Sequence, residues 1–209
     1  MDNQAAGPNK KVDRRKFLAL VGGTAAVGAG AFLAPGCSKG NGPVIKIVST
    51  LPRTGSAQGQ TDTIVNGIKM AIDEYPDGLF GHKIAYTDMD DATAAQGQWD
   101  AGKEADNARE AVSDKDVMAV IGPYNSGASK VSQPILSEAG LVQISPAATW
   151  PGLTKKVPGD DKTGEPEIYR KGALTFCRVC PTDFVQGPLS AVFAKDKGFK
   201  TVYVLDDKE

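Results

Sequence analysis

The sequence predicts an α/β fold in which helices alternate with the strands of a parallel sheet. Two apolar runs of strand length, residues 117–121 and 141–144, each lead directly into a loop of small and polar residues. A segment of helix length, residues 130–139, separates them and is followed by Gly140, which suits the left-handed position after a helix end. This order of strand, loop, helix, strand and loop is typical of an open parallel sheet.

Two further strands and a helix precede this unit. Residues 44–50 are mostly β-branched and predict the first strand, and residues 83–89 predict the second. Between them, a Gly-rich turn over residues 53–60 leads into a helix whose cap is Thr61 or Asp62. The apolar residues of this helix recur at helical spacing, so one of its faces should pack on the sheet.

The remaining elements continue the alternation. A helix is expected over about residues 93–112, and residues 154–171 interrupt the pattern with Pro and Gly and predict a loop. Strands over residues 175–179 and 201–205 then flank a helix of about residues 186–197. The expected inner stripe of the 93–112 helix comprises Ala101, Ala105, Ala108 and Val112.

The loops after the two central strands, residues 122–129 and 145–149, carry small residues and hydroxyl groups. The carboxyl ends of parallel strands meet at one edge of a sheet, and ligands bind there at the point where the strand order reverses. Small residues let a ligand approach the backbone, while Ser and Thr hydroxyls and helix-start N–H groups donate hydrogen bonds to an anionic group. The pattern predicts a site for a small polar molecule.

Five segments, in the same order along the chain, are similar to the leucine/isoleucine/valine-binding proteins of ABC importers. The clearest are Ala-Val-Ile-Gly-Pro-Tyr-Asn-Ser and Glu-Ala-Gly-Leu-Val-Gln-Ile-Ser-Pro-Ala-Ala-Thr. The segments are residues 45–55, 66–73, 119–126, 138–149 and 178–187, and together they cover most of residues 44–205.

The resemblance implies the type I periplasmic-binding-protein architecture, in which two α/β lobes close on a ligand and the closed form docks on an ABC permease. Residues 44–178 match the first lobe, with its Rossmann-like parallel sheet, and residues 179–209 match the beginning of a second, similar lobe. The family's proteins are longer, so a truncated form is expected. The alternative within this fold is a ligand-sensing receptor domain for amino acids or amides.

The resemblance also assigns site residues. Ser126 matches the loop serine that binds the α-carboxylate or amine of an amino acid, and Ala147 and Thr149 match positions that contact the same groups. As an alternative, Ser126 and Thr149 merely cap helices. Trp150 either lines the cleft or packs inward. The other expected cleft-lining residues are Tyr124, Asn125 and Ala148.

The loop after the first strand departs from the family pattern. The family often places an aromatic residue there to cover the ligand, whereas this chain has Ser-Ala-Gln-Gly-Gln over residues 56–60. Gln58 or Gln60 is a candidate to hydrogen-bond a ligand, and a solvated loop position is the alternative for both. This departure argues against leucine itself as the ligand. The resemblance as a whole implies an amino acid, branched-chain or a related small polar solute.

Residues 1–37 have the features of an export leader and are set apart from the fold. Arg14 and Arg15 precede two large apolar residues and resemble a twin-arginine signal. The apolar run 18–33 is shorter than the roughly 20 residues of a spanning helix and is rich in glycine. The leader therefore predicts that the protein is exported to the periplasm or the cell surface.

Cys37 ends the leader in a segment that resembles a bacterial lipobox, in which the Cys is lipidated. Residues 38–43 have the composition of a flexible tether, and a lipid chain with such a tether holds a domain at the membrane surface. The alternative is cleavage by ordinary signal peptidase near Ala34, which leaves Cys37 as a free thiol.

Other polar residues are weaker candidates. Asp88, Asp90 and Asp91 cluster at a strand end, but no partners with metal-ligand spacing follow, so capping of the next helix is expected and no metal. His82 is the single histidine and is expected on the surface. Cys177 and Cys180 are expected to be two buried small side chains, with a disulfide as the alternative in an oxidising compartment.

Composition and motifs exclude several classes. The chain has 41% hydrophobic and 23% charged residues, which is ordinary for a globular protein. It has no basic stripe with interleaved aromatics, which argues against nucleic acid as a partner. The chain also lacks P-loop, dinucleotide-binding and nucleophile-elbow motifs, so no cofactor and no catalysis are expected. Twin-arginine export, which often carries cofactor-loaded enzymes, is the one argument for an enzyme.

Overall fold

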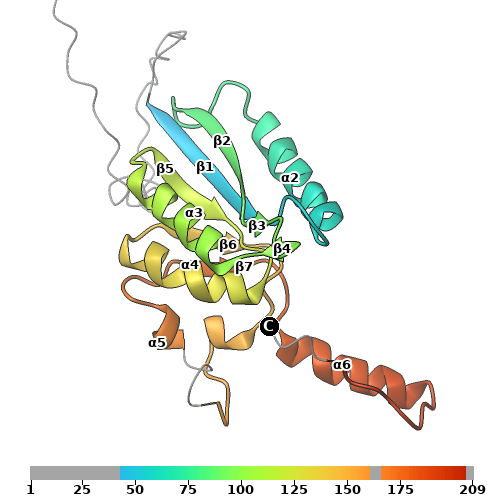
Figure 1. Ribbon diagram of the computed structural model, residues 1–209. Helices are drawn as coiled ribbons and strands as arrows, with labels where there is room; N and C mark the ends of the chain where they lie inside the picture. Colours follow the sequence, from blue (N-terminus) through green and yellow to red (C-terminus); the bar gives the residue numbers. More distant parts are fainter. Residues whose placement is uncertain (1–42, 161–165, 206–209) are drawn as a thin grey trace, which may run out of the picture.

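The computed structural model describes residues 43–160 and 166–205. In this part of the chain, parallel strands form one sheet in the order β2-β1-β5-β6-β7 (Figure 1). The parallel α/β sheet predicted from the sequence is therefore confirmed. The strands are β1 (Val44–Leu51), β2 (Lys83–Asp90), β5 (Val117–Ile121), β6 (Val142–Ser145) and β7 (Phe176–Arg178).

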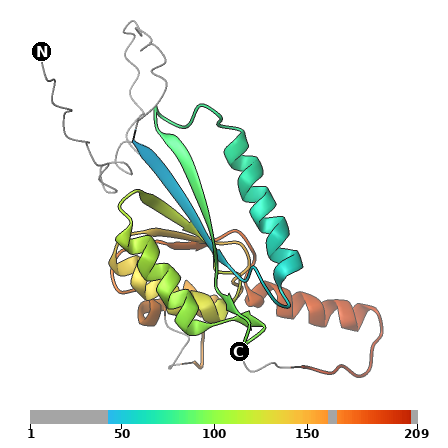
Figure 2. The ribbon, with the colours of Figure 1, turned by 45° about the horizontal axis from the view of Figure 1, so that its top comes forward.

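Helices cover both faces of this sheet. Helix α2 (Gln58–Asp73) lies on one face, and α3 (Ala101–Ser113) and α4 (Ser126–Glu138) pack side by side on the other (Figure 2). The chain leaves β1 toward β2 on one side and then crosses back to β5 on the other side of β1. The strand order therefore reverses between β1 and β5, which is where an open parallel sheet binds ligands.

The core between the sheet and the α3–α4 layer is apolar. It joins strand residues Val48, Val117 and Val120 to helix residues, and burial of such side chains is the main stabilising term of the fold. The helical and loop members of this cluster are Ala108, Ala111, Leu136 and Leu141.

A second buried cluster lies beyond β6 and β7. It contains Ala148, Leu153, Tyr169 and Phe176, which come from β7, the loop after β6 and two short helices. These helices are η1 (Pro151–Leu153) and α5 (Pro166–Tyr169). Helix α5 lies within residues 154–171, which were predicted to be a loop, and it contributes Tyr169 to this cluster.

The starts of α2 and α3 differ from the sequence prediction. Helix α2 begins at Gln58 rather than after Thr61. Helix α3 begins at residue 101, because residues 92–99 form a hairpin of β3 (Ala92–Thr93) and β4 (Gln98–Trp99). Gly97, with a φ of 65°, adopts the left-handed conformation that closes the hairpin.

The inner face of α3 also differs from the predicted stripe of small residues. Ala108 is buried and Val112 packs against the core, but Ala101 is exposed. Glu104 and Asn107 are buried instead. Polar residues are tolerated on this face because they find hydrogen-bond partners on β1 and β2.

Helix α6 (Asp183–Asp196) extends away from the sheet and has no buried residue (Figure 1). Its exposed apolar side chains line a shallow groove that includes Val185, Leu189 and Phe193. The strand predicted over residues 201–205 is wrong, because these residues have no regular structure and are exposed. A strand needs a neighbouring strand for its hydrogen bonds, and none of the described segments supplies one here.

The export leader, including Arg14, Arg15 and Cys37, lies outside the described residues, as does nearly all of the predicted tether. Within the ranges 43–160 and 166–205, no helix has the length and apolar character needed to cross a membrane.

Candidate functional site

The loops after β5 and β6 meet at the carboxyl edge of the sheet, beside the point where the strand order reverses. Strands β5 and β6 are neighbours in the sheet, and Ile121 of β5 pairs with Ile144 of β6. At the end of β5, Gly122 has a φ of 130°, and a Cβ there would collide with the carbonyl oxygen of Thr50 on β1. Only glycine fits this close approach, which keeps the β5 loop against β1.

Ser126 connects the two loops. It occupies the first turn of α4, which begins four residues earlier than predicted, with Asn125 as its N-cap residue. The Ser126 hydroxyl accepts a hydrogen bond of 3.1 Å from the backbone N–H of Trp150. Ser126 therefore does not act as the helix cap, and it joins the loop after β5 to the loop after β6.

The first turn of α4 provides further donors. Its first intrahelical bond runs from the Ser129 N–H to the Asn125 carbonyl, so the N–H groups of residues 126–128 have no acceptor within the helix. These N–H groups and the positive end of the helix dipole favour an anionic group beside Ser126.

Ser145 shapes the loop after β6. Its hydroxyl donates to the Pro123 carbonyl at 2.7 Å and accepts from the N–H groups of Ala147 at 3.3 Å and Ala148 at 2.9 Å. Sequence reasoning missed this residue. A serine that bonds to N–H groups two and three residues onward is a recognisable turn signal, and Ser145 stands at that spacing before the matched residues.

The predicted cleft residues divide into two groups. Tyr124, Asn125, Ala147 and Thr149 are half-buried at the loops. Ala148 is fully buried in the second core cluster, so its side chain does not face a cleft. Thr149 caps no helix, and its carbonyl accepts a bond of 3.1 Å from the Asp183 N–H.

Trp150 is half-buried and packs against the second core cluster, as the inward alternative predicted. The ammonium of Lys130, one turn along α4 from Ser126, lies 5.1 Å from the centre of the Trp150 ring. This is cation–π distance. A positive charge therefore lies over the Trp150 side chain.

Trp99, which the sequence analysis did not single out, covers the start of α4. It comes from the β3–β4 hairpin, and a Cβ on Gly127 would overlap its ring. The hairpin thus packs against the helix start. No sequence pattern signalled this contact, since a hairpin so short has no periodicity.

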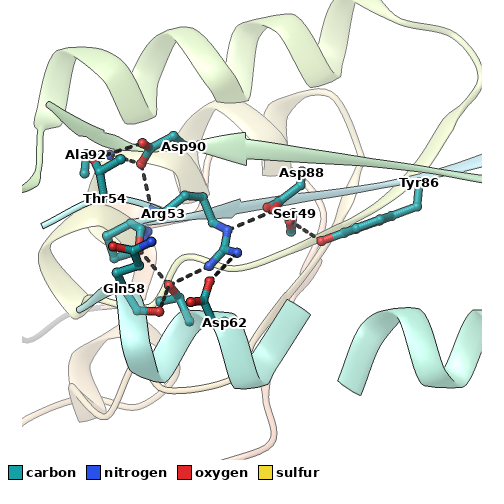
Figure 3. A network of polar contacts seen from close by, with 11 residues as sticks. Ser49, Arg53, Thr54, Gln58, Asp62, Tyr86, Asp88, Asp90 and Ala92 are labelled. Atoms are coloured by element: carbon teal, nitrogen blue, oxygen red, sulfur yellow. Dashed lines mark hydrogen bonds and ion pairs between the residues drawn. The ribbon is translucent and has the colours of Figure 1, made fainter. Parts of the chain in front are cut away.

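Arg53 organises the loop after β1. Its side chain binds Asp88 at 2.9 Å, Asp62 at 2.7 Å and the Thr61 hydroxyl at 2.7 Å, and its N–H donates to Asp90 at 2.8 Å (Figure 3). These partners tie β2 to α2. Since the three guanidinium nitrogens are engaged within the protein, Arg53 serves the fold.

Gln58 and Gln60 lie in the first turn of α2 and are exposed. Residues 58–60 are helical instead of part of the predicted Gly-rich turn. The Arg53 side chain stabilises this helix start, because it binds Thr61 and Asp62 one turn into α2.

Asp88, Asp90 and Asp91 do not cap the following helix, contrary to the prediction. Asp88 pairs with Arg53, and Asp90 accepts from the N–H groups of Arg53 and Ala92. The cap of α3 is Asp100, whose side chain accepts from the Lys103 N–H at 2.9 Å. The hairpin between β2 and α3 separates the acidic cluster from the helix start.

Asp91 and Glu104 form a buried acidic pair. Burial and the nearby charge of Asp90 raise the pKa of Asp91 to about 7, and burial and Asp91 raise the pKa of Glu104 well above its usual value. The Thr50 hydroxyl donates to Glu104 and accepts from the Asn107 amide at 3.1 Å. Both carboxyl groups are fully buried, so a substrate cannot reach them and their role is structural.

His82 is half-buried and forms a bridge with Leu79, so it is less exposed than predicted. Among the described residues, no three His, Cys, Asp or Glu side chains gather as metal ligands. Cys177 and Cys180 are free thiols. The expectation that both are buried is wrong, because Cys177 is exposed on the edge strand β7 and Cys180 is only half-buried.

Comparison with known proteins shows which family this chain is similar to. A sequence model described as "Periplasmic binding protein" matches residues 44–208. The Leu/Ile/Val-binding protein BraC3 of Rhizobium johnstonii is 29% identical over 160 residues, which cover 75% of this chain and 38% of the relative. The chain thus spans about two fifths of the length of the curated relatives it matches.

Solved structures share the fold. The leucine-binding protein LivK of Thermotoga maritima matches with a TM-score of 0.59 and 28% identity, over 74% of this chain and 38% of its own. A solute-binding protein of Rhodopseudomonas palustris in complex with 3,4-dihydroxybenzoic acid matches with a TM-score of 0.58 and 22% identity, over 76% of this chain and 38% of its own.

Proposed function

The chain belongs to the periplasmic binding protein family, whose members bind solutes and are not enzymes, and we propose that it captures an amino acid outside the cytoplasm for an ABC-type permease. Residues 44–178 act as the first ligand-binding lobe, and residues 179–209 begin a second one. The ligand is a branched-chain amino acid or a related small polar solute.

The observation that carries this proposal is the bond between the Ser126 hydroxyl and the Trp150 N–H. It brings the start of α4 next to Thr149, so hydroxyl groups and helix-start N–H groups come from two loops that are adjacent in space. Such a set of donors suits a carboxylate. Ser126 and Thr149 bind this group, Ala147 supports it from the backbone, and Tyr124 and Asn125 lie beside it.

The charges near these loops support an anionic ligand group. Lys130 lies over Trp150, and Arg178 donates to the carbonyls of Ala148 and Trp150. Amino acids and aromatic acids both carry a carboxylate, so this charge alone does not separate them. The amino acid is favoured because the Rhizobium relative and LivK, which bear leucine-related names, are more similar in sequence than the R. palustris protein that holds an aromatic acid.

Export and anchoring complete the proposal. Arg14 and Arg15 direct the chain through twin-arginine export, and Cys37 is lipidated so that the tether over residues 38–43 holds the folded domain at the membrane surface. Such tethering keeps the loaded binding protein near its permease, where the effective concentration is high.

Calorimetric titration tests the ligand class. Purified protein is titrated with L-leucine, L-isoleucine, L-valine and 3,4-dihydroxybenzoic acid, each up to millimolar concentration, with L-lysine as a charged amino-acid control. We expect binding of at least one branched-chain amino acid at about millimolar strength, because one lobe contacts only about one side of the ligand, and weaker binding of L-lysine. Binding of the benzoate alone would replace the proposed ligand, and absence of binding by all five would contradict the proposal.

A further inference from the structure

Arg178, at the end of β7, holds the two carbonyl groups on either side of Thr149. Its Nη1 donates to the Ala148 carbonyl at 2.7 Å and to the Trp150 carbonyl at 2.8 Å. Its Nη2 donates to the Thr154 hydroxyl at 2.9 Å. One side chain thus fixes the backbone immediately before and after Thr149 and also the turn that follows.

The contacts of Arg178 are those of an orienting group rather than an ion pair. The guanidinium is half-buried and lies 5.6 Å from the centre of the Phe176 ring. Burial, the largest effect, lowers its pKa. Among the described residues it forms no ion pair with a carboxylate, and the acceptors identified for it are neutral oxygens.

The residues after Arg178 continue the same attachment. The Val179 N–H donates to the Ser145 carbonyl and the Asp183 N–H donates to the Thr149 carbonyl, both at 3.1 Å. The carbonyls of residues 148, 149 and 150 therefore all accept hydrogen bonds from residues 178–183. The path of the Thr149 loop is therefore fixed by the end of β7 and the segment that follows it.

We propose that Arg178 is a positioning residue of the solute site, which holds Thr149 in its ligand-binding conformation by clamping the flanking carbonyl groups. This inference rests on the proposed role of Thr149 as a ligand contact. Lysine cannot fully replace Arg178, because its single ammonium lacks the planar set of donors that reaches three acceptors in fixed directions.

A ligand-free measurement tests the clamp itself. The chain has two tryptophans, so Trp99→Phe leaves Trp150 as the sole reporter. In that background we expect Arg178→Gln to increase quenching of Trp150 by acrylamide, and Arg178→Lys to give an intermediate increase. The control is Arg109→Gln on α3, since Arg109 is exposed and paired only with Asp106 among the described residues. Quenching unchanged in Arg178→Gln would overturn the clamp.

A double-mutant comparison tests whether Arg178 acts through Thr149. With Trp99 present and L-leucine as the probe, Arg178→Gln and Thr149→Ala should each weaken binding about tenfold, or about 1.4 kcal/mol. If Arg178 acts by placing Thr149, the double variant should bind about as weakly as Thr149→Ala alone. Additive losses would overturn the inference, and thermal melts of each variant establish that it is folded.

The two proposals fail in different ways. If Thr149→Ala and Ser126→Ala leave L-leucine binding unchanged, the proposed site is wrong, and with it the role of Arg178 in binding. If Thr149→Ala weakens binding but Arg178→Gln does not, the site stands and the positioning role is refuted.

Discussion

The hydroxyl of Ser126 accepts a hydrogen bond of 3.1 Å from the backbone N–H of Trp150, so the loops after β5 and β6 are joined at the carboxyl edge of the sheet. The bond uses the Ser126 oxygen as an acceptor and leaves its O–H available as a donor. The same residue can therefore stabilise the loop pair and contact a ligand.

Removal of a site hydroxyl should weaken ligand binding. We expect Ser126→Ala and Thr149→Ala each to reduce the affinity for L-leucine by roughly 1 to 3 kcal/mol, the usual effect of leaving a buried charged group short of a partner. Calorimetric titration measures this change. Ser113→Ala is a matched control, because Ser113 is exposed at the end of α3. Unaltered affinity in both site variants would refute the assignment.

Gly127→Ala should destabilise the protein, because the added methyl group overlaps the Trp99 ring. Overpacking of this kind costs about 1 to 3 kcal/mol in free energy of unfolding, which urea denaturation measures. In a Trp99→Ala background the penalty should vanish. Gly67→Ala is the control, since that helical glycine has open space around it and should be stabilised by up to about 1 kcal/mol. An equal penalty with and without Trp99 would contradict the contact.

Stability should fall as the pH rises from about 4 to about 7. The pKa of Asp91 is raised from 3.8 to about 7, mainly by burial, so the folded protein favours the protonated carboxyl. Below the pKa of Asp91 in the unfolded chain, the carboxyl is protonated in both states and its ionisation costs no stability. As the pH rises toward the pKa of Asp91 in the folded protein, ionisation in the unfolded chain lowers the free energy of unfolding. A shift of about three units at about 1.4 kcal/mol each corresponds to a loss of about 4 kcal/mol.

Urea unfolding at about pH 5 and about pH 8 measures the part of this loss that falls above pH 5, which spans about two pH units and amounts to about 3 kcal/mol. Asp91→Asn should reduce the difference between the two conditions, and Glu104→Gln should reduce it further, because the pKa of Glu104 is raised in the same direction. Asp73→Asn, at an exposed carboxylate of α2, should leave the difference unchanged. An equal pH dependence in Asp91→Asn and the parent chain would contradict the buried-acid interpretation.

Cys37→Ser should release the exported protein from membranes, since a lipidated Cys37 is the proposed anchor. Membrane fractionation followed by immunoblotting measures the distribution. A membrane-bound fraction that is the same for Cys37→Ser and the parent would show that the lipobox interpretation is wrong and would favour cleavage near Ala34.

Replacement of both leader arginines, Arg14→Lys with Arg15→Lys, should block export, because the twin-arginine pathway recognises the pair. The precursor should then accumulate in the cytoplasmic fraction. Replacement of Lys10 and Lys11 by Arg keeps the positive charge and serves as the control. Normal export of the double Arg-to-Lys variant would indicate a general secretory leader instead.

Periodicity and loop composition were sufficient to predict the parallel sheet and the position of the two site loops. Strands such as Val117–Ile121 are short apolar runs whose period is local, and the loops that follow them lie at one sheet edge in any parallel arrangement. Ser126 and Thr149 could therefore be placed near each other before any contact was known.

Other features depend on partners that are distant in sequence. Glu104 and Asn107 lie on a helix face predicted to be apolar, and they are buried there next to Thr50, a residue of another element that hydrogen-bonds to both. Similarly, Gln58 lies in a helix rather than a turn because Arg53 draws Thr61 and Asp62 toward β2. Local propensity cannot anticipate such long-range hydrogen bonds.

The sequence by itself determined the strands of the main sheet, the helices that cover it and the edge at which the hydroxyl-bearing loops lie, because these follow from local patterns of apolar and small residues. Only the tertiary structure decided how that edge is held together. Trp99 covers Gly127, Arg178 holds the carbonyls beside Thr149, and Ala148 is directed into the core. Each of these depends on the packing of segments that are far apart in the chain, where shape and hydrogen-bond geometry, rather than residue type, select the partner.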